Sequence, residues 1–426
     1  MTKNDIEPRT VSEAAPYELP AGWKWCRLGE VFSINPRVQA DDALQASFVP
    51  MEKIEPDNKN MFSFSVEQWG KIKRNHTQFT DGDVCFAKIS PCFENGKAFI
   101  ARGLENGIGA GTTELIVLRN SEINSKYTFY FISNGAFIRK GRATYSGTVG
   151  QQRINMDFVK SYPFPLPPTL AEQQRIVSRI ESLFTKLDEA KDKAQSVLDG
   201  FELRRAAVLH KAFTGELTAK WRKEHGVSDD SWEEKTIGEC CKLGSGGTPS
   251  KRNPEYYENG TLSWLKTGEI DWNDIYDTEE KITEEGMNNS SAKIYPAESV
   301  VVAMYGMGVT RGKTGILKQA MTTNQAVCVL QPDNSLFNRY LFYYFMCNYW
   351  TFREKAVGGN QLNYSATMIG KWEINLPPLP EQQEIVRILD TVLEKEADAK
   401  EAAQSVLDQI ALLKKSILSR AFRGEL

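Results

Sequence analysis

The chain has 426 residues, of which 41 % are hydrophobic, and a formal net charge of −3 at pH 7. This length predicts about two to three domains with ordinary cores, and the charge excludes a general polyanion binder, so any nucleic-acid contact must come from local basic faces. Seven cysteines without paired ligand spacing and only three histidines argue against a metal site. Residues 1–16 lack the apolar core of a signal peptide, and no stretch approaches the roughly 18 apolar residues of a membrane span. We therefore expect a soluble cytoplasmic protein with reduced, mostly buried thiols.

One stretch of sequence occurs twice, at an offset of 209 residues. Glu172-Gln173-Gln174 returns as Glu381-Gln382-Gln383. Residues 172–217 and 381–426 share 21 identities over 46 positions without a gap. Unrelated helical segments would match at only a handful of positions, so we interpret the chain as two copies of one unit.

Each copy is predicted to be a globular head followed by a long helix. In chain order we expect a disordered tail at 1–16, a first head at 17–164, a first helical region at 165–217, a charged connector at 218–230, a second head at 231–373 and a second helical region at 374–426. Short apolar runs between glycine and polar turns predict strands at 84–87, 114–118, 300–304 and 326–330. Helical segments near 124–142 and 335–356 make each head a mixed α/β domain. The heads align only loosely, and 37–80 has no convincing counterpart in 246–295.

Apolar residues in the helical regions recur at spacings of four and three, which is typical of a coiled-coil seam. Thr169 and Glu172 form a capping-box pattern, Pro380 suits a first helical turn, and Gly215 and Gly424 stand where a helix needs a left-handed stop. About 42 residues at ~1.5 Å rise give a rod of roughly 60 Å. The predicted seam residues are Ile176, Ile180, Leu183, Leu187, Ala190, Ala194, Val197 and Phe201 in the first copy, and Ile385, Leu389, Val392, Ala399, Ala403, Val406, Ile410, Ile417 and Ala421 in the second.

Three charged residues interrupt this seam. Leu187 of the first copy becomes Glu396, and Arg205 and Lys414 occupy one equivalent position. These residues are either partly exposed near a helix end or in contact with another protein. The sequence leaves both interpretations open.

The order of these features resembles the DNA-specificity (S) subunit of type I restriction-modification systems. The matching residues are Leu166-Pro167-Pro168 through Val177, Leu376-Pro377-Pro378 through Val386, and the turn Gly247–Ser250. The resemblance implies an α+β fold, in which two mixed α/β target-recognition domains are separated by two long helices packed as an antiparallel coiled coil with approximate two-fold symmetry. It also implies that each head reads one half of a gapped target in double-stranded DNA.

The same resemblance implies the partners. The helices would dock two methyltransferase subunits, which restriction subunits can join. Adenine methylation and ATP-dependent cleavage would belong to those partners. The chain itself would be non-catalytic and bind no cofactor, with S-adenosylmethionine, ATP and magnesium on the partner subunits.

DNA recognition needs cationic groups for phosphates and amide or guanidinium groups for base edges. In the first head such groups form three clusters, the first flanked by Trp69 and Phe79, and the candidates are Lys71, Lys73, Arg74, Lys88, Lys97, Arg142, Tyr145, Gln151, Gln152 and Arg153. In the second head the candidates are Thr248, Ser250, Lys251, Arg252, Lys266, Arg311, Lys313, Asn360, Gln361 and Asn363. For each residue alone, a solvated charge or a turn-stabilising amide is the alternative.

Three further stretches of sequence resemble enzyme motifs, but each one is incomplete. Residues 308–314 look like a phosphate loop, but Met307 stands where the first glycine should be, so a tight surface turn is the better interpretation. Asn35-Pro36 lacks the second proline and the aromatic residue of an adenine-methyltransferase motif, and Glu279-Glu280-Lys281 lacks the upstream strand of a nuclease site. Two rival functions remain: a methyltransferase or nuclease with a divergent active site, and a coiled-coil adaptor that binds proteins.

Overall fold

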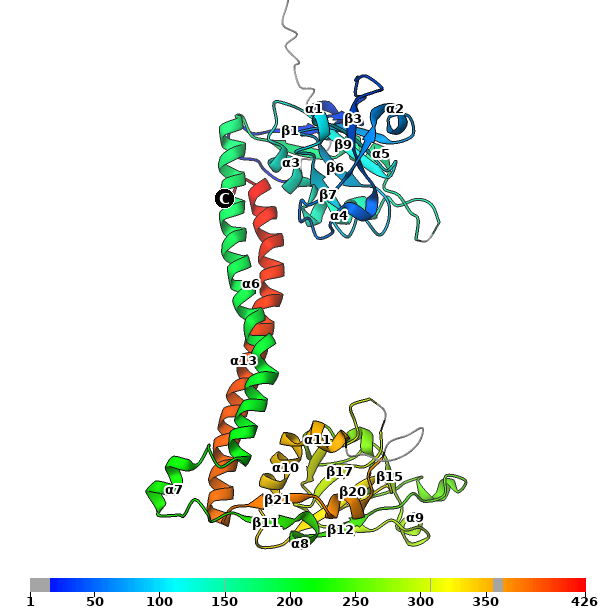
Figure 1. Ribbon diagram of the computed structural model, residues 1–426. Helices are drawn as coiled ribbons and strands as arrows, with labels where there is room; N and C mark the ends of the chain where they lie inside the picture. The colour runs from blue at the N-terminus through cyan, green and yellow to red at the C-terminus, as the bar shows by residue number, and fades with distance from the viewer. Residues whose placement is uncertain (1–15, 149, 307, 355–362) are drawn as a thin grey trace, which may run out of the picture. The chain divides into compact units, whose positions relative to one another are not determined.

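The computed structural model describes residues 16–148, 150–306, 308–354 and 363–426 (Figure 1). The chain forms two compact units: unit 1 is Met1–Gln195 with Gln404–Leu426, and unit 2 is Ser196–Ala403. Each unit contains one head and part of both long helices, α6 (Leu170–Phe213) and α13 (Leu379–Phe422). The compact unit therefore differs from the sequence repeat, because each head is joined by the end of the other copy's helix.

Head 1 is built on three sheets. An antiparallel pair joins β1 (Lys24–Arg27) to β10 (Pro163–Leu166). An antiparallel sheet has the order β2 (Ser33–Ile34), β9 (Leu115–Arg119), β6 (Val84–Ala87) and β7 (Ala98–Ile100). The third sheet, in which β3 and β8 run parallel, has the order β4 (Ser65–Gln68), β3 (Gln45–Val49), β8 (Ile108–Gly111) and β5 (Thr77–Thr80). The helices are α1 (Leu28–Val31), α2 (Trp69–Ile72), α3 (Ser125–Ile132), α4 (Gly135–Arg142) and α5 (Met156–Ser161), with 3₁₀ turns η1 (Met51–Lys53) and η2 (Glu105–Gly107).

Head 2 has corresponding sheets. The antiparallel pair is β11 (Glu233–Thr236) with β21 (Glu373–Leu376). The larger sheet has the order β12 (Cys241–Ser245), β20 (Val327–Pro332), β17 (Val300–Ala303), β18 (Thr314–Leu317) and β14 (Asp274–Ile275). The third sheet has the order β15 (Lys281–Ile282), β13 (Leu262–Leu265), β19 (Met321–Thr323) and β16 (Ile294–Tyr295). The helices are α8 (Ile237–Cys240), α9 (Glu284–Asn288), α10 (Asn338–Cys347), α11 (Tyr349–Glu354) and α12 (Ala366–Gly370), with 3₁₀ turns η3 (Pro254–Tyr256) and η4 (Thr267–Glu269).

The two heads share one topology even where their sequences could not be aligned. The parallel pair β3 and β8 of head 1 corresponds to the parallel pair β13 and β19 of head 2, and each pair has one antiparallel neighbour on either side. Among the described residues, head 2 adds β14 at the edge of its larger sheet. The segments 37–80 and 246–295 thus diverged in sequence while keeping their strands. The strands predicted from the sequence correspond to β6, β9, β17 and β20, and the predicted helical segments correspond to α3 with α4 and α10 with α11, so both predictions are confirmed.

The central strand of each larger sheet is buried on both faces, which explains its continuous apolar run. In β6, Val84 and Phe86 belong to the core cluster under helices α3 and α4, whereas Cys85 belongs to the cluster facing the third sheet. In β17, Val300 and Val301 divide in the same way between two clusters. Each head is therefore layered as helices, larger sheet and third sheet.

The end of the other copy's helix completes the core of each head. In unit 1, Phe422 at the end of α13 is fully buried, and its ring centroid lies 5.2 Å from those of Tyr127 and Phe131. In unit 2, Phe213 at the end of α6 lies 5.0 Å from Tyr340. The repeated Ala-Phe pair at the helix ends is thus a core contact.

A buried glutamine joins each helix to its own head. Gln173 Oε1 accepts a hydrogen bond from the backbone N–H of Asn124, the N-cap of α3, at 2.8 Å. Gln382 Oε1 accepts one from Phe337, the N-cap of α10, also at 2.8 Å, and its Nε2 donates to the carbonyls of Ser335 and Pro377. The first glutamine of each Glu-Gln-Gln motif therefore fixes the helix start against the head.

The coiled-coil seam is confirmed with one change of phase. Ile176, Ile180, Ala194, Ile385, Leu389, Ala403, Ile410 and Ala421 are buried, and most other predicted seam residues are half-buried. Ala399 and Val406 are exposed, which corrects the prediction for both. Leu407 is half-buried in place of Val406, because a step of four after Ala403, rather than three, keeps the apolar side chain on the seam.

The predicted helix ends are also confirmed. Thr169 Oγ1 accepts from the Glu172 N–H at 3.2 Å, although the Glu172 carboxylate pairs with Arg175 rather than returning to the cap. Gly215 and Gly424 have φ values of 79° and 74° just after α6 and α13, the left-handed region that ends a helix. None of the described helices is long and apolar enough to cross a membrane.

Two of the three charged seam residues have partners on the opposite helix. Lys414 Nζ lies 2.5 Å from Asp188 Oδ1 in unit 1. Glu396 pairs with Arg204 at 2.9 Å in unit 2. Both pairs join α6 to α13 in antiparallel orientation, and they account for these two charges within the chain. Arg205 is half-buried.

The predicted charged connector contains a short helix. This helix is α7 (Ala219–His225), and Arg222 is buried. Arg222 Nη1 and the Thr218 hydroxyl both donate to Glu381 Oε1 at 2.7 Å, and Trp232 Nε1 donates to Glu381 Oε2 at 3.1 Å. Because a buried carboxylate needs such partners, α7 is fixed to the start of α13.

Candidate nucleic-acid interface

Two of the predicted clusters in head 1 meet at one corner. The ten residues 88–97 form the loop between β6 and β7, and the segment after α4 lies along it. The Ser90 N–H donates to the Gln152 carbonyl at 2.8 Å, and the Ile154 N–H donates to the Lys88 carbonyl at 3.0 Å. We call residues 88–97, 142–148 and 150–154 corner 1.

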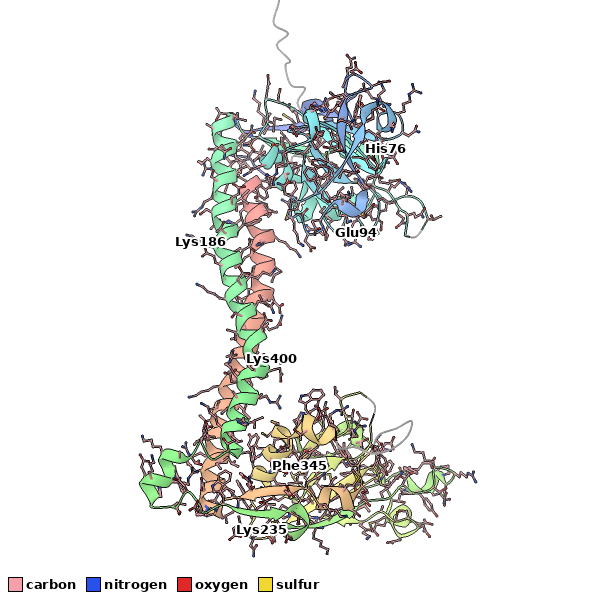
Figure 2. All side chains as sticks on the ribbon, viewed as in Figure 1. His76, Glu94, Lys186, Lys235, Phe345 and Lys400 are labelled. Carbon is pink, nitrogen blue, oxygen red and sulfur yellow. The ribbon has the colours of Figure 1, made fainter. Side chains whose placement is uncertain are left out.

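Several candidate side chains of corner 1 are held by neighbours within the head. Arg153 forms a two-point ion pair with Glu114, with Nε–Oε2 and Nη2–Oε1 distances of 2.9 and 2.7 Å. The Tyr145 hydroxyl donates to Glu94, which also accepts from the Ser90 hydroxyl at 2.9 Å. Figure 2 labels Glu94 in head 1. Burial alone would raise the pKa of Glu94, but the hydrogen bonds from Tyr145 and Ser90 lower it below its usual value. These residues stabilise the shape of the corner.

The other candidates of corner 1 can reach a ligand. Arg142, on the last turn of α4, and Gln151 are exposed, and Lys88 and Gln152 are half-buried. Lys97 Nζ donates to the Met51 carbonyl at 2.8 Å. Corner 1 therefore presents cations and amides on a frame of fixed side chains.

The cluster at 71–76 lies apart from corner 1, around α2. Lys71 and Arg74 are exposed, and Lys73 pairs with Asp42. Trp69 and Phe79, which stand on either side of this cluster in the sequence, are both fully buried. They are core residues beside the third sheet.

Head 2 has an equivalent corner. The ten residues 304–313 join β17 to β18, and the Tyr364 N–H donates to the Met304 carbonyl at 3.1 Å, as Ile154 does to Lys88 in head 1. Both loops end in Gly-Lys, with φ values of 65° at Gly96 and 90° at Gly312. We call residues 304–306, 308–313, 349–354 and 363–364 corner 2.

The candidates of corner 2 have diverse environments. Arg311 is 9 % exposed, with its guanidinium carbon 5.7 Å from the Tyr364 ring centroid. Lys313 Nζ lies 2.5 Å from Asp271 Oδ1. Asn363 is half-buried. Asn360 and Gln361 lie outside the described residues.

The remaining candidates of head 2 lie near the Gly-Thr-Pro-Ser turn. The Thr248 hydroxyl donates to the Gln325 side chain, and Lys266 Nζ lies 3.0 Å from Glu280 Oε1. Trp264 Nε1 donates to the Gly247 carbonyl at 2.9 Å, which anchors the turn. The exposed candidates here are Thr248, Ser250, Lys251 and Arg252.

Comparison with known proteins places the chain in a family. Residues 20–197 and 229–407 match the family described as "Type I restriction modification DNA specificity domain". The chain belongs to this family. The specificity subunit of the type I restriction enzyme EcoEI from Escherichia coli is 39 % identical over 197 residues, which cover 46 % of this chain and 33 % of that protein. The EcoAI specificity subunit, also from Escherichia coli, is 38 % identical over 198 residues, with the same coverage. The match thus spans about a third of the length of these relatives.

Solved structures share the fold of this specificity-family chain. The HsdS subunit from Thermoanaerobacter tengcongensis aligns with a TM-score of 0.71 and 23 % identity, covering 96 % of this chain and 99 % of that one. A chain from a study of assembly and conformational transition in a type I R-M system aligns with a TM-score of 0.70 and 22 % identity, covering 96 % and 100 %. These likenesses support the fold.

The sequence analysis missed one cation of corner 2. Arg353, on α11, donates to the carbonyls of Arg311 and Gly308, each at 2.6 Å. It stands 42 residues after Arg311 in the sequence, so no local pattern could place it beside the β17–β18 loop.

The motifs that suggested other chemistry have structural roles. Residues 308–313 lie in the β17–β18 loop, which confirms a turn. Lys281 pairs with Asp277 at 3.1 Å, and hydrogen bonds from the Ser263 hydroxyl, the Thr278 backbone and Lys281 lower the pKa of Asp277 to about 2. No group of three His, Cys, Asp or Glu residues that could hold a metal ion occurs in the described ranges. All seven cysteines are free, and burial raises the pKa of the Cys328 thiol to about 12.

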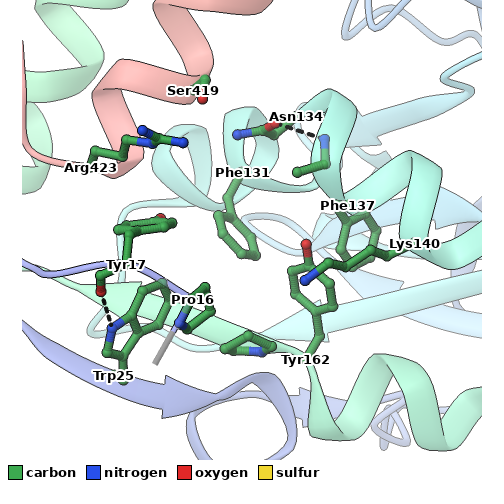
Figure 3. Close-up of a pocket in the computed structure, with 12 residues that line it drawn as sticks. Pro16, Tyr17, Trp25, Phe131, Asn134, Phe137, Lys140, Tyr162, Ser419 and Arg423 are labelled. Atoms are coloured by element: carbon green, nitrogen blue, oxygen red, sulfur yellow. Dashed lines mark hydrogen bonds between the residues drawn. The ribbon is translucent and has the colours of Figure 1, made fainter. Parts of the chain in front are cut away.

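A cavity of about 180 Å³ lies in unit 1 between α4 and the end of α13 (Figure 3). Its walls include Tyr17, Phe131 and Tyr162, and burial raises the pKa of both tyrosines to about 12. Lys140 Nζ lies 5.8 Å from the Tyr162 ring and the Arg423 guanidinium 5.3 Å from the Tyr17 ring. The volume is below the roughly 300–1,000 Å³ of small-molecule sites, so we regard the cavity as a packing feature.

The ion pair in corner 1 yields a double-mutant test. We expect Arg153→Ala and Glu114→Ala each to lower the melting temperature, and the double replacement to lower it little further, because all three changes remove one ion pair. Differential scanning calorimetry measures this. Arg142→Ala, at an exposed position of α4, should leave the melting temperature unchanged. Additive losses, or no loss from Arg153→Ala, would show that Arg153 does not hold the corner.

Proposed function

We propose that this chain is the non-catalytic DNA-specificity subunit of a type I restriction-modification system in the cytoplasm. Each head reads one half of a bipartite, gapped target in double-stranded DNA. The observation that carries this proposal is one topology used twice, with different side chains at equivalent corners. Corner 1 presents Lys88, Gln151 and Gln152, whereas corner 2 presents Trp350 and Arg353. Two heads of one fold with unlike corners suit two unlike half-sites.

The available side chains suit the chemistry of DNA reading. Phosphate contacts need exposed cations, which Lys71, Arg74, Arg142, Lys251 and Arg252 supply. Base edges need amide or guanidinium groups, and Gln151 and Gln152 supply amides in corner 1. A chain with a net charge of −3 can bind DNA through such local groups.

The helices are proposed to dock two methyltransferase subunits. Leu203 and Leu412 occupy the same position of the two copies, 209 residues apart, and are 76 % and 65 % exposed. A large apolar side chain at this exposure suggests a contact with another protein, and its repetition suggests two identical partners. Restriction subunits join this assembly, and S-adenosylmethionine, ATP and magnesium serve adenine methylation and DNA cleavage on the partner subunits.

Methylation mapping tests the proposed function. The chain is co-expressed with its cognate methyltransferase subunit in a host that lacks other adenine methylation, and modified adenines are located by sequencing. We expect one bipartite motif with a gap of fixed length. A continuous palindrome, or no motif, contradicts the proposal. Methylation by the chain alone would favour a divergent methyltransferase, and a complex without salt-dependent DNA affinity would favour a protein adaptor.

The repeated leucines yield a prediction on assembly. Leu203→Ser and Leu412→Ser should each reduce the number of bound methyltransferase subunits from two to one, and the double replacement should abolish binding, because each removes one apolar contact. Native mass spectrometry measures the stoichiometry. Leu413→Ser is the matched control, since Leu413 is 47 % exposed but its counterpart is Arg204. An equal loss with Leu413→Ser, or no loss with the repeated pair, refutes the assignment.

A further inference from the structure

Corner 2 exposes a large aromatic side chain. Trp350, the second residue of α11, is 68 % exposed, whereas its helix neighbours Tyr349 and Phe352 are buried. Val309, on the adjoining loop, is 57 % exposed. Exposed tryptophan is costly in water and commonly marks a contact surface.

The backbone beneath Trp350 is tied to the β17–β18 loop. The Tyr349 hydroxyl donates to the Val309 carbonyl, and Arg353 donates to the Gly308 and Arg311 carbonyls. The Arg353 guanidinium carbon lies 5.3 Å from the Tyr349 ring centroid and 5.8 Å from that of Trp350. Trp350 is therefore presented to solvent from a fixed helix.

Head 1 shows that the fold does not require this exposure. The aromatic residue of α4 is Phe137, whose ring centroid lies 4.9 Å from that of Tyr162, as that of Phe352 on α11 lies 3.8 Å from that of Trp372. Phe137 is 1 % exposed and packs against Phe86 at 5.8 Å. The exposed aromatic side chain is thus specific to corner 2.

The charges around Trp350 favour an anionic partner. Arg353 hydrogen-bonds to carbonyl and hydroxyl oxygens, and none of its contacts within the described residues is an ion pair with a carboxylate. Arg311 lies in the same corner, 5.7 Å from the Tyr364 ring. An exposed indole beside a guanidinium matches a nucleic-acid strand, which offers stacked bases and phosphates together.

We propose that Trp350 stacks on a base, or enters a base step, of the half-site bound by head 2, with Arg353 supplying adjacent positive charge. This inference rests on the proposed function. Stacking is tolerant of base identity because every base has a π-face. Trp350 therefore contributes affinity and favours half-sites with an easily unstacked step such as TA or CA.

The test measures DNA binding by the assembled complex of this chain and its methyltransferase partner. Fluorescence anisotropy gives the Kd for duplexes carrying the mapped target, at several salt concentrations. Trp350→Ala should weaken binding by about 5- to 100-fold, and Trp350→Phe should retain most of the affinity. The slope of log Kd against log salt should stay unchanged, because no phosphate contact is removed.

Tyr276→Ala is the matched control. Tyr276 is 69 % exposed in the same head, outside corner 2. Its replacement should leave the Kd unchanged.

Each other outcome overturns the inference. Wild-type affinity in Trp350→Ala refutes the stacking while leaving the proposed function intact. Loss of methyltransferase co-purification in Trp350→Ala assigns the surface to a protein partner instead. If the wild-type assembly itself shows no specific, salt-dependent DNA binding, the proposed function fails, and the stacking fails with it.

Discussion

The architecture of each unit depends on the attachment of a head to its long helix through one buried glutamine. Gln173 is 3 % exposed and Gln382 is 0 % exposed. Gln173 accepts a hydrogen bond from the N-cap residue of α3, and Gln382 accepts one from the N-cap residue of α10. A buried amide left without partners costs about 1–3 kcal/mol. A second hydrogen bond joins each of these helices to the strand that leads into the long helix. The Tyr127 hydroxyl donates to a backbone carbonyl of β10, and the Tyr340 hydroxyl donates to one of β21, each at 2.8 Å. The head and the start of its helix therefore behave as one body.

A second attachment at the far helix end leaves the corners free to differ. Phe422 packs into the core of head 1 and Phe213 against the core of head 2, so both long helices are fixed to each head. The corners lie on loops at the ends of central strands and contribute little to these attachments. Side chains there differ between the heads, since corner 1 exposes Gln151 and corner 2 exposes Trp350, while the topology stays the same. This separation of fixed attachment from variable surface gives the proposed function a physical basis, because one fold can then carry different side chains at its two corners.

The sequence predicted the helices better than the surfaces. Periodicity and capping signals are local, so most of the seam and the stops at Gly215 and Gly424 were found, and the seam prediction was wrong at Ala399 and Val406. Side-chain partners far apart in the chain were invisible: Arg153 is paired with Glu114, and Trp69 beside a basic cluster is buried. The shared strand order of 37–80 and 246–295 also lay beyond sequence reasoning, because β strands of two to five residues with different loops leave no alignable pattern.

The buried glutamine is tested most directly by comparing two neighbouring, chemically identical residues. Gln382 is buried and bonded to Phe337, whereas Gln383 is exposed. Hydrogen-exchange mass spectrometry of the full chain would follow the amides of 337–347 in Gln382→Ala and Gln383→Ala. The account predicts faster exchange at the start of α10 in Gln382→Ala alone, with α3 of head 1 unchanged. Equal exchange in both variants would contradict the claim that this side chain joins head and helix.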